Sequence, residues 1–193
     1  MTGKKQLPRN TQKKSGKMDL PEILSYDEID AVVAASDDLE ELAFLHVGLY
    51  GGLRISEIIG LRVKDVRPDL LAVFVRAESA KGDKERYVPV TSSTIALLRG
   101  LSRKKGLEDL IFSRKQRAYQ FRLDNLAEKA GVRKINPHML RHTCATMQVD
   151  QGIDLETIRA NLGHSDISTT QIYLHLNIRR RSRKYHDAMR GII

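Results

Sequence analysis

Residues 136–173 have the sequence NPHMLRHTCATMQVDQGIDLETIRANLGHSDISTTQIY, and the interpretation of the whole chain depends on this stretch. Pro137 suits the first position of a helix, where its missing N–H costs nothing. His138, Arg141 and His142 then fall at i, i+3 and i+4, which places them on one face of that helix. Their polar ends can therefore meet, so the stretch begins with a cluster of cationic donors.

A second helix is expected to begin near Asp154, because apolar residues recur at helical spacing from there to position 162. Gly163 would end it, since glycine is the usual residue just past a helix end. His164 then lies directly after the helix. A third helix would start one or two residues later and present Tyr173 from a packed element. A phenol is thus expected near the cationic cluster.

The length and the hydrophobic content indicate one compact globular domain. The chain has 193 residues, 41% of them hydrophobic and none of them Trp, which is enough for a normal core. No apolar run has the length of a membrane span, and we find no signal peptide, so we expect a cytoplasmic protein. The single cysteine, Cys144, excludes an internal disulfide and is expected to be a small buried residue.

The net charge of +9 is unevenly distributed along the chain. Residues 1–19 form a basic arm with six basic residues and one acidic residue, whereas residues 20–50 contain eight acidic residues and no basic ones. Residues 51–141 have twenty basic against ten acidic residues, and residues 177–193 have six against one. A polyanion is therefore the expected partner, and the alternative is a merely solvated basic surface.

Capping signals predict two helices in the acidic segment. Ser25 and Glu28 form a capping box that opens a helix through about Ala35. Ser36 or Asp37 would cap the next helix, which the glycine pair at 51–52 ends. The sequence GLRISE follows, and Arg54 and Glu57 at i, i+3 can pair there, which would fix the direction of the guanidinium.

The middle of the chain predicts a β-hairpin followed by further helices. Residues 70–75 are apolar and rich in β-formers, and residues 86–90 alternate, with Lys81 at the intervening turn. Thr91 would cap a helix to about residue 103, and another helix is expected over 119–129. The predicted fold is α+β, mainly α-helical, with one small antiparallel sheet.

Five separated motifs resemble the tyrosine recombinase (phage integrase) family, in particular its Xer-like and archaeal members. They are GLRISE around Arg54, AKGDKERYVPV around Lys81, HMLRH from His138, LGH at His164, and Tyr173. The resemblance covers residues 20–176 and implies a tyrosine recombinase catalytic domain there. Residues 1–19 would be a disordered arm or linker, and residues 177–193 a basic tail or helix that is exchanged between protomers.

The resemblance also implies a role for each matching residue. Tyr173 would attack a DNA phosphate and form a 3′-phosphotyrosyl intermediate, and no cofactor or metal would be needed. The other roles are phosphate binding by Arg54 and Arg141, protonation of the leaving 5′ oxygen by Lys81, completion of the pocket by His138 and His164, and support by Glu57 and His142. The partners would be double-stranded DNA and three further copies, forming a homo-tetramer on paired sites from a monomer in solution. An accessory DNA-binding protein and association with the nucleoid also fit.

Three alternatives remain open at this point. A type IB topoisomerase uses nearly the same chemistry to relax DNA, and a DNA-binding assembly protein could have lost catalysis. A metal site is conceivable from His138, His142, Cys144 and His164. However, Met139 stands where a zinc hydrolase has glutamate, and Arg141 would place a cation beside the metal. Family members usually carry a separate core-binding domain before the catalytic domain, whereas only a short basic segment precedes it here. The chain would then be either a naturally minimal recombinase or an excised catalytic domain.

Overall fold

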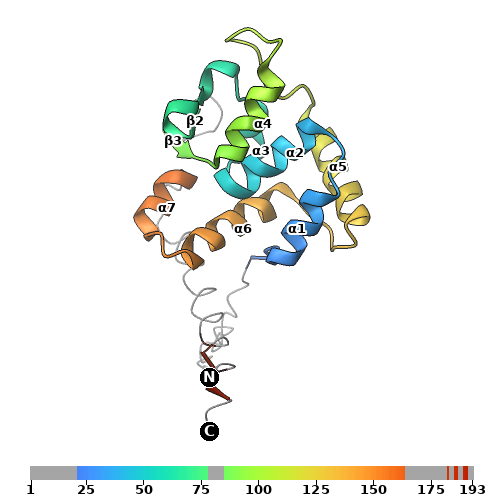
Figure 1. Cartoon of the computed structure of the whole chain (residues 1–193), viewed down its shortest axis with the longest axis vertical. Coiled ribbons are helices and arrows are strands. Elements are labelled where there is room, and N and C mark those ends of the chain that lie inside the picture. The colour runs from blue at the N-terminus through green and yellow to red at the C-terminus, as the bar shows by residue number, and fades with distance from the viewer. Residues whose placement is uncertain (1–20, 78–84, 164–181, 183–184, 187–188, 191–193) are drawn as a thin grey trace, which may run out of the picture.

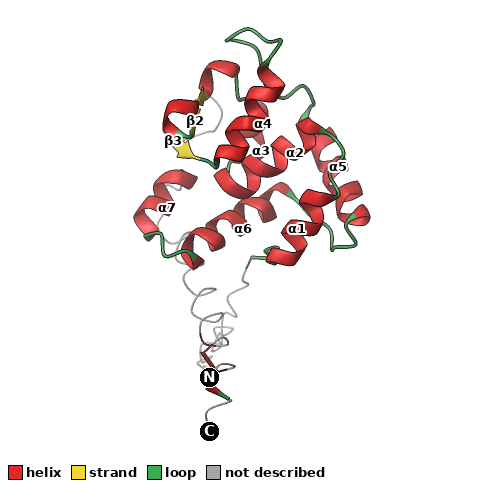
Figure 2. Cartoon of the chain, viewed as in Figure 1, coloured by secondary structure: helices red, strands yellow, loops and turns green. Residues whose placement is uncertain are grey.

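A computed structural model describes residues 21–77, 85–163, 182, 185–186 and 189–190 of the chain. Its helices surround a main hydrophobic core, a smaller cluster lies between α6 and α7, and a small sheet lies at one side of the helices (Figures 1 and 2). The fold is α+β and mainly helical, as predicted. The α-helices are α1 Tyr26–Ala34, α2 Leu39–His46, α3 Ile55–Ile59, α4 Ser92–Ser102, α5 Gln116–Lys129, α6 Pro137–Asp150 and α7 Leu155–Leu162. The strands are β1 Val66–Arg67, β2 Ala72–Val75 and β3 Arg86–Pro89, and short turns of other helix types are η1 Val47–Gly51, η2 Val63–Asp65 and η3 Pro68–Leu70.

Helix α6 runs through the domain and packs closely against η1, the π-helical turn that continues α2. The close approach depends on Gly48, because a Cβ there would lie 2.9 Å from Leu140 Cδ1. Leu140 itself is fully buried. The apolar side of α6 therefore joins the main core, while its first turn reaches the surface.

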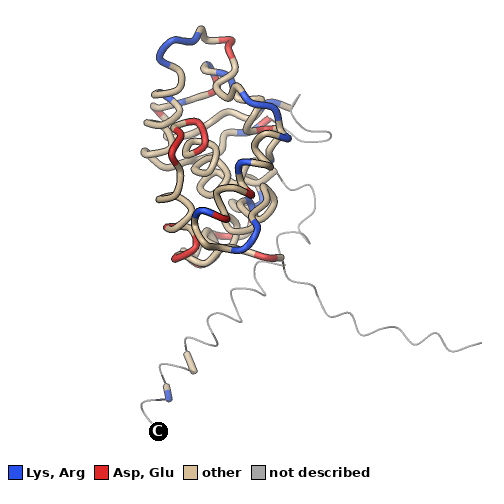
Figure 3. Tube along the Cα trace, turned by 90° about the vertical axis from the view of Figure 1, so that its right-hand side faces the viewer, with Lys and Arg blue, Asp and Glu red and all other residues tan. Residues whose placement is uncertain are grey.

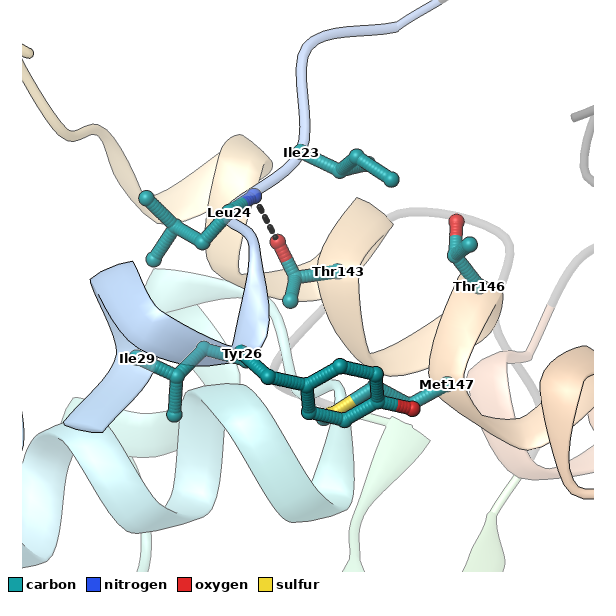
Figure 4. Close-up of a pocket in the computed structure, with 7 residues that line it drawn as sticks. All are labelled: Ile23, Leu24, Tyr26, Ile29, Thr143, Thr146 and Met147. Atoms are coloured by element: carbon teal, nitrogen blue, oxygen red, sulfur yellow. Dashed lines mark hydrogen bonds between the residues drawn. The ribbon is translucent and has the colours of Figure 1, made fainter. Parts of the chain in front are cut away.

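The segment before α1 is attached to α6 (Figure 4). The Leu24 backbone N–H donates a hydrogen bond of 2.9 Å to Thr143 Oγ1, and this pair is buried. Ser25 then caps α1 and accepts from the Glu28 N–H, while the Glu28 carboxylate accepts from the Ser25 N–H. The predicted capping box is confirmed. It starts α1 directly after Leu24, the residue that is bonded to α6.

Three predicted element boundaries were wrong. Asp38 caps α2, and not Ser36 or Asp37. Its carboxylate accepts from the backbone N–H groups of residues 40 and 41. Arg114 and Arg122 also donate to this carboxylate and hold it in place. The helix predicted over residues 119–129 begins earlier, at Gln116. Residues 70–71 form a turn instead of strand, and Leu71 adopts a positive φ of 48°.

The sheet has the order β1-β2-β3, and both pairings are antiparallel. The predicted hairpin is confirmed, with Val73 opposite Val88 and Phe74 opposite Tyr87. Strand β1 was not predicted, because two residues are too few to show an alternating pattern. The hairpin tip with Lys81 lies outside the described residues.

Ion pairs neutralise much of the acidic segment that begins α2. Asp38 pairs with Arg114 at 2.5 Å and with Arg122 at 2.8 Å, and Glu41 pairs with Arg122 at 3.2 Å. Lys129 pairs with Asp37. By contrast, the basic stretch 103–105 lies in the connection after α4, at the top of the domain (Figure 3). Within the described part of the chain, no helix is long and apolar enough to cross a membrane.

Candidate active site

Helix α6 begins as its sequence predicts and places two histidines and an arginine at its start. The Asn136 side chain accepts from the Met139 N–H at 2.9 Å, and Pro137 occupies the first turn. His138 is exposed, His142 is half-buried and Arg141 is buried. The three residues therefore share one face but reach different depths.

Arg141 connects α6 to two distant parts of the chain. Its Nη1 donates to the Gly52 carbonyl oxygen at 2.8 Å, and its Nη2 donates to the Leu162 carbonyl oxygen at 2.5 Å. Gly52 lies just before Arg54, and Leu162 is the last residue of α7. The guanidinium thus holds the start of the GLRISE motif against the end of α7.

Arg54 and Glu57 pair as the i, i+3 spacing predicts. Arg54 Nη1 lies 3.1 Å from Glu57 Oε1, and the Arg54 backbone N–H donates to Glu57 Oε2 at 2.8 Å. The Glu57 side chain is completely buried, while 30% of the Arg54 side chain is exposed. Arg54 Nη2 also donates to the Gly163 carbonyl oxygen at 3.3 Å. Glu57 therefore orients a guanidinium that reaches the surface beside the end of α7.

Arg86, at the start of β3, is a member of this cluster that the sequence-based prediction missed. Its Nη2 lies 3.0 Å from both carboxylate oxygens of Glu57, and its Nε donates to the Asn161 carbonyl oxygen at 2.9 Å. A signal was available, because Arg86 shares the inward side of an alternating strand with Val88 and Val90. A charged residue at a core-facing position usually has a buried partner.

Three consecutive carbonyl groups at the end of α7 each accept from a different arginine. Asn161 O accepts from Arg86, Leu162 O from Arg141, and Gly163 O from Arg54. We call these three guanidiniums the arginine cap. The last carbonyls of a helix lack intrahelical partners and carry partial negative charge, so cations are well placed there. Helix α7 lies beside β3 and α6, which supply two of the three arginines (Figure 1).

His138 and His142 line an open pocket of about 230 Å³ together with Asn136, Met139 and the segment 21–22. Burial lowers the pKa of His142, and the nearby positive charges of His138 and Arg141 lower it further. The neutral form of His142 is therefore favoured beside the Arg141 guanidinium.

The structure offers little for the metal site that the sequence left open. Within residues 21–77, 85–163 and the few described tail positions, no group of three or more His, Cys, Asp or Glu side chains is arranged to hold a metal ion. Burial raises the pKa of the Cys144 thiol to about 11, whereas a metal binds the thiolate. Cys144 is buried, as predicted. His164, the remaining candidate ligand, lies outside the described residues.

Comparison with known proteins identifies the family. The family model described as "Phage integrase family" matches residues 19–180. The chain belongs to the phage integrase family. Integrase-family relatives include tyrosine recombinase XerC of Xanthomonas axonopodis pv. citri (strain 306), which is 38% identical over 182 residues, covering 88% of this chain and 59% of XerC. Tyrosine recombinase XerA of Saccharolobus solfataricus is 36% identical over 170 residues, covering 87% of this chain and 57% of XerA.

Solved structures of the family agree with the fold. A crystal structure of XerA recombinase superimposes with a TM-score of 0.75 at 30% identity, covering 88% of this chain and 65% of that chain. The fold is thus that of a tyrosine recombinase catalytic domain. The chain spans less than two thirds of the length of these curated relatives.

The structure places five of the eight residues that the integrase resemblance selects. Arg54, Glu57 and Arg141 are brought together at the end of α7, and His138 and His142 line the neighbouring face of α6. Lys81, His164 and Tyr173 lie outside the described residues. His164 follows directly on Gly163 in the sequence. Gly163 is itself bonded to the arginine cap through Arg54.

Gly52 combines a strained backbone with close packing, so the stability of the fold should depend on a glycine at this position. Its φ is 65°, and a Cβ there would lie 2.6 Å from Leu162 Cδ2 and 3.1 Å from Cys144 Sγ. We predict that Gly52→Ala lowers the free energy of unfolding by ~2–4 kcal/mol, from backbone strain and overpacking together. Urea unfolding of the purified protein measures this loss.

Gly131 provides the matched control for Gly52→Ala. It has nearly the same φ, 66°, but a Cβ there would meet nothing within 4 Å. Gly131→Ala should therefore show the backbone strain alone, of about 1 kcal/mol. Equal losses in the two variants would show that packing against Leu162 and Cys144 contributes nothing.

Proposed function

We propose that the chain carries the catalytic domain of a site-specific DNA recombinase, within residues 20–176, that cuts and rejoins strands through a 3′-phosphotyrosyl intermediate. The observation that carries the proposal is the meeting of Arg54 and Arg141, from two separated motifs, at the end of α7. These guanidiniums stay charged, and their planar forks match the oxygens of a phosphoryl group. The relatives named as tyrosine recombinases support the same reaction class.

In the proposed reaction Tyr173 is the nucleophile. Its phenolic oxygen gives up its proton to water as it attacks phosphorus, a new P–O bond forms, and the bond from phosphorus to the 5′ oxygen breaks. Lys81 gives its proton to the departing 5′ oxygen, while Arg54 and Arg141 stabilise the charge on the non-bridging oxygens. His138 and His164 complete the pocket, with His142 in support. The phosphotyrosyl bond conserves the energy of the cut strand, so attack by a 5′-hydroxyl rejoins DNA without another energy source.

Double-stranded DNA is the proposed partner, and four protomers would act on two sites. The net charge of +9 and the basic segments 1–19 and 177–193 fit a polyanion. Residues 1–19 are proposed to be an arm or linker, and residues 177–193 a segment passed to a neighbouring protomer in a closed ring. Without DNA, the protein is proposed to be a monomer. It is also proposed to associate with the nucleoid and to act with an accessory DNA-binding protein.

A suicide substrate tests the function directly. A binding sequence would first be selected from random duplexes and then synthesised with a nick beside the expected cleavage position, so that the small fragment diffuses away after cleavage. The protein should accumulate as a covalent DNA adduct on a denaturing gel. Because the arginines and Lys81 supply the positive charge that a two-metal nuclease takes from its ions, the adduct should form equally in EDTA.

Three results would argue against this function. Complete loss of cleavage in EDTA, with recovery when a divalent ion is added, would indicate a metal-dependent enzyme. Binding without any adduct would indicate a DNA-binding assembly protein. Relaxation of supercoiled plasmid without strand exchange between two paired sites would indicate a topoisomerase of the IB type.

A further inference from the structure

We infer that Arg86 is a positioning residue of this site, one that fixes Arg54 and the end of α7 in a single rigid arrangement. The inference rests on the proposed function, because it concerns how the phosphate-binding geometry is maintained. Arg86 lies within the AKGDKERYVPV motif, but the resemblance assigned it no role. Its contacts come from two parts of the chain that are far apart in sequence, Glu57 and the end of α7.

The first contact fixes the carboxylate that orients Arg54. Arg86 Nη2 lies within 3.0 Å of both oxygens of Glu57, and the Glu57 side chain is completely buried. Without Arg86, the carboxylate would keep its bonds to Arg54 but lose its second cation. A buried carboxylate with one partner fewer is free to rotate or to take up a proton. Either change would alter the direction of the Arg54 guanidinium.

The second contact fixes the end of α7. Arg86 Nε donates to the Asn161 carbonyl oxygen at 2.9 Å. The guanidinium also lies flat against Gly163, since a Cβ there would be 2.8 Å from both Cζ and Nη1 of Arg86. Gly163 has a φ of 65°, so this position needs glycine for its backbone and for its contact with Arg86. The path of the chain into His164 is thereby tied to β3.

The Arg86 guanidinium is directed at Glu57 and at the end of α7. Only 10% of its side chain is exposed, against 30% for Arg54. Its Nη1 is buried and has no hydrogen-bond partner among the described residues. Arg86 therefore acts through Arg54 and the end of α7.

Loss of this arrangement should reduce the rate of cleavage more than the affinity for DNA. A misplacement of about 1 Å in a catalytic group costs ~10²-fold in rate. We expect Arg86→Met to slow single-turnover cleavage of the suicide substrate by ~30- to 100-fold. The dissociation constant for the same duplex should change less than ~3-fold, because the buried side chain makes no phosphate contact. Arg86→Lys should recover part of the rate, since lysine keeps the charge beside Glu57 but cannot also bond to Asn161.

Arg122→Met is the matched control. Arg122 is also partly buried and also bridges two elements, donating to Asp38 at 2.8 Å and to Glu41 at 3.2 Å. Both of its partners belong to the start of α2, which supplies none of the arginine cap. This variant should lose thermal stability without a comparable loss in the rate constant for cleavage, measured well below its melting temperature.

Two further measurements separate positioning from general destabilisation. In an Arg54→Ala background, Arg86→Met should cost less than ~5-fold, because a residue that acts through Arg54 has little left to position. Hydrogen exchange should also speed up at residues 161–163 in Arg86→Met but not in Arg122→Met. A full, additive loss in the Arg54→Ala background, or unchanged exchange at the end of α7, would overturn the inference.

The outcomes also separate this inference from the proposed function. If the wild-type protein forms adduct and Arg86→Met cleaves at the wild-type rate, the function stands and the positioning role is wrong. If the wild-type protein forms no adduct, the proposed function fails. Hydrogen exchange at residues 161–163 then still decides whether Arg86 holds the end of α7.

Discussion

Tyr173→Phe should abolish the covalent protein–DNA adduct and leave DNA binding nearly unchanged. The substitution removes a single oxygen atom, and that oxygen is the atom proposed to attack phosphorus. No other group in the proposed site can form the same ester. We therefore expect adduct formation to fall below detection, a loss of at least ~10⁴-fold, while the dissociation constant stays within about threefold of the wild type. Denaturing gels measure the first quantity and gel shifts the second.

The other tyrosines provide the controls for Tyr173→Phe. Burial and the hydrogen bond to Glu40 raise the pKa of Tyr119, so this phenol is a poor nucleophile. Burial also raises the pKa of Tyr50. Tyr185 is 62% exposed and follows the proposed nucleophile in the chain, so Tyr185→Phe is the most demanding control. Adduct that persists in Tyr173→Phe, or that maps to Tyr185 by peptide sequencing, would refute the assignment.

Arg141→Lys should be the most damaging substitution that keeps the charge of the site. Arg141 uses two nitrogens at once, one toward the Gly52 carbonyl and one toward the Leu162 carbonyl. A lysine ammonium cannot span these two acceptors and also reach a phosphate, because it is a single point of charge. We expect cleavage to slow by ~10²–10³-fold, which is the usual cost of losing one preorganised donor. The free energy of unfolding should also fall, because two buried carbonyls lose a partner.

Arg99→Lys is the control for Arg141→Lys, because Arg99 is an exposed residue of α4. The same change of side chain there should alter neither the cleavage rate nor the stability by a measurable amount. Rates should be measured with protein in excess over the suicide substrate, so that weaker binding does not disguise a chemical defect. Near wild-type cleavage in Arg141→Lys would mean that only the charge at this position matters.

The sequence predicts best those features that depend on local signals. Helix α6 begins at Pro137 with Asn136 as its cap, and α7 begins after Asp154 and ends at Gly163. Each of these boundaries depends on side chains within a few residues of the helix end. The pairing of Arg54 with Glu57 was predictable for the same reason, since the two residues are one helical turn apart.

The features that the sequence did not predict depend on distant partners. Asp38 was not expected as the cap of α2, because the arginines that hold it are 76 and 84 residues away. Arg86 was assigned only to a strand, because its bond to Asn161 spans 75 residues and its partner Glu57 lies 29 residues away. Strand β1 is recognisable only from its pairing with β2. Spacing within a motif carries no information about such contacts.

The arginine cap also determines at which stage of synthesis and folding the site can form. Arg54 and its acceptor at Gly163 are 109 residues apart, and Arg141 and its acceptor at Gly52 are 89 residues apart. Contacts of such long range form only after much of the domain has been ordered. During synthesis, Arg54 and Glu57 leave the ribosome well before residue 163 does, since chains emerge from their N-terminus at roughly 5–20 residues per second. A nascent or truncated chain that lacks α7 therefore has no assembled arginine cap, so the proposed DNA cleavage would become possible only as the domain is completed.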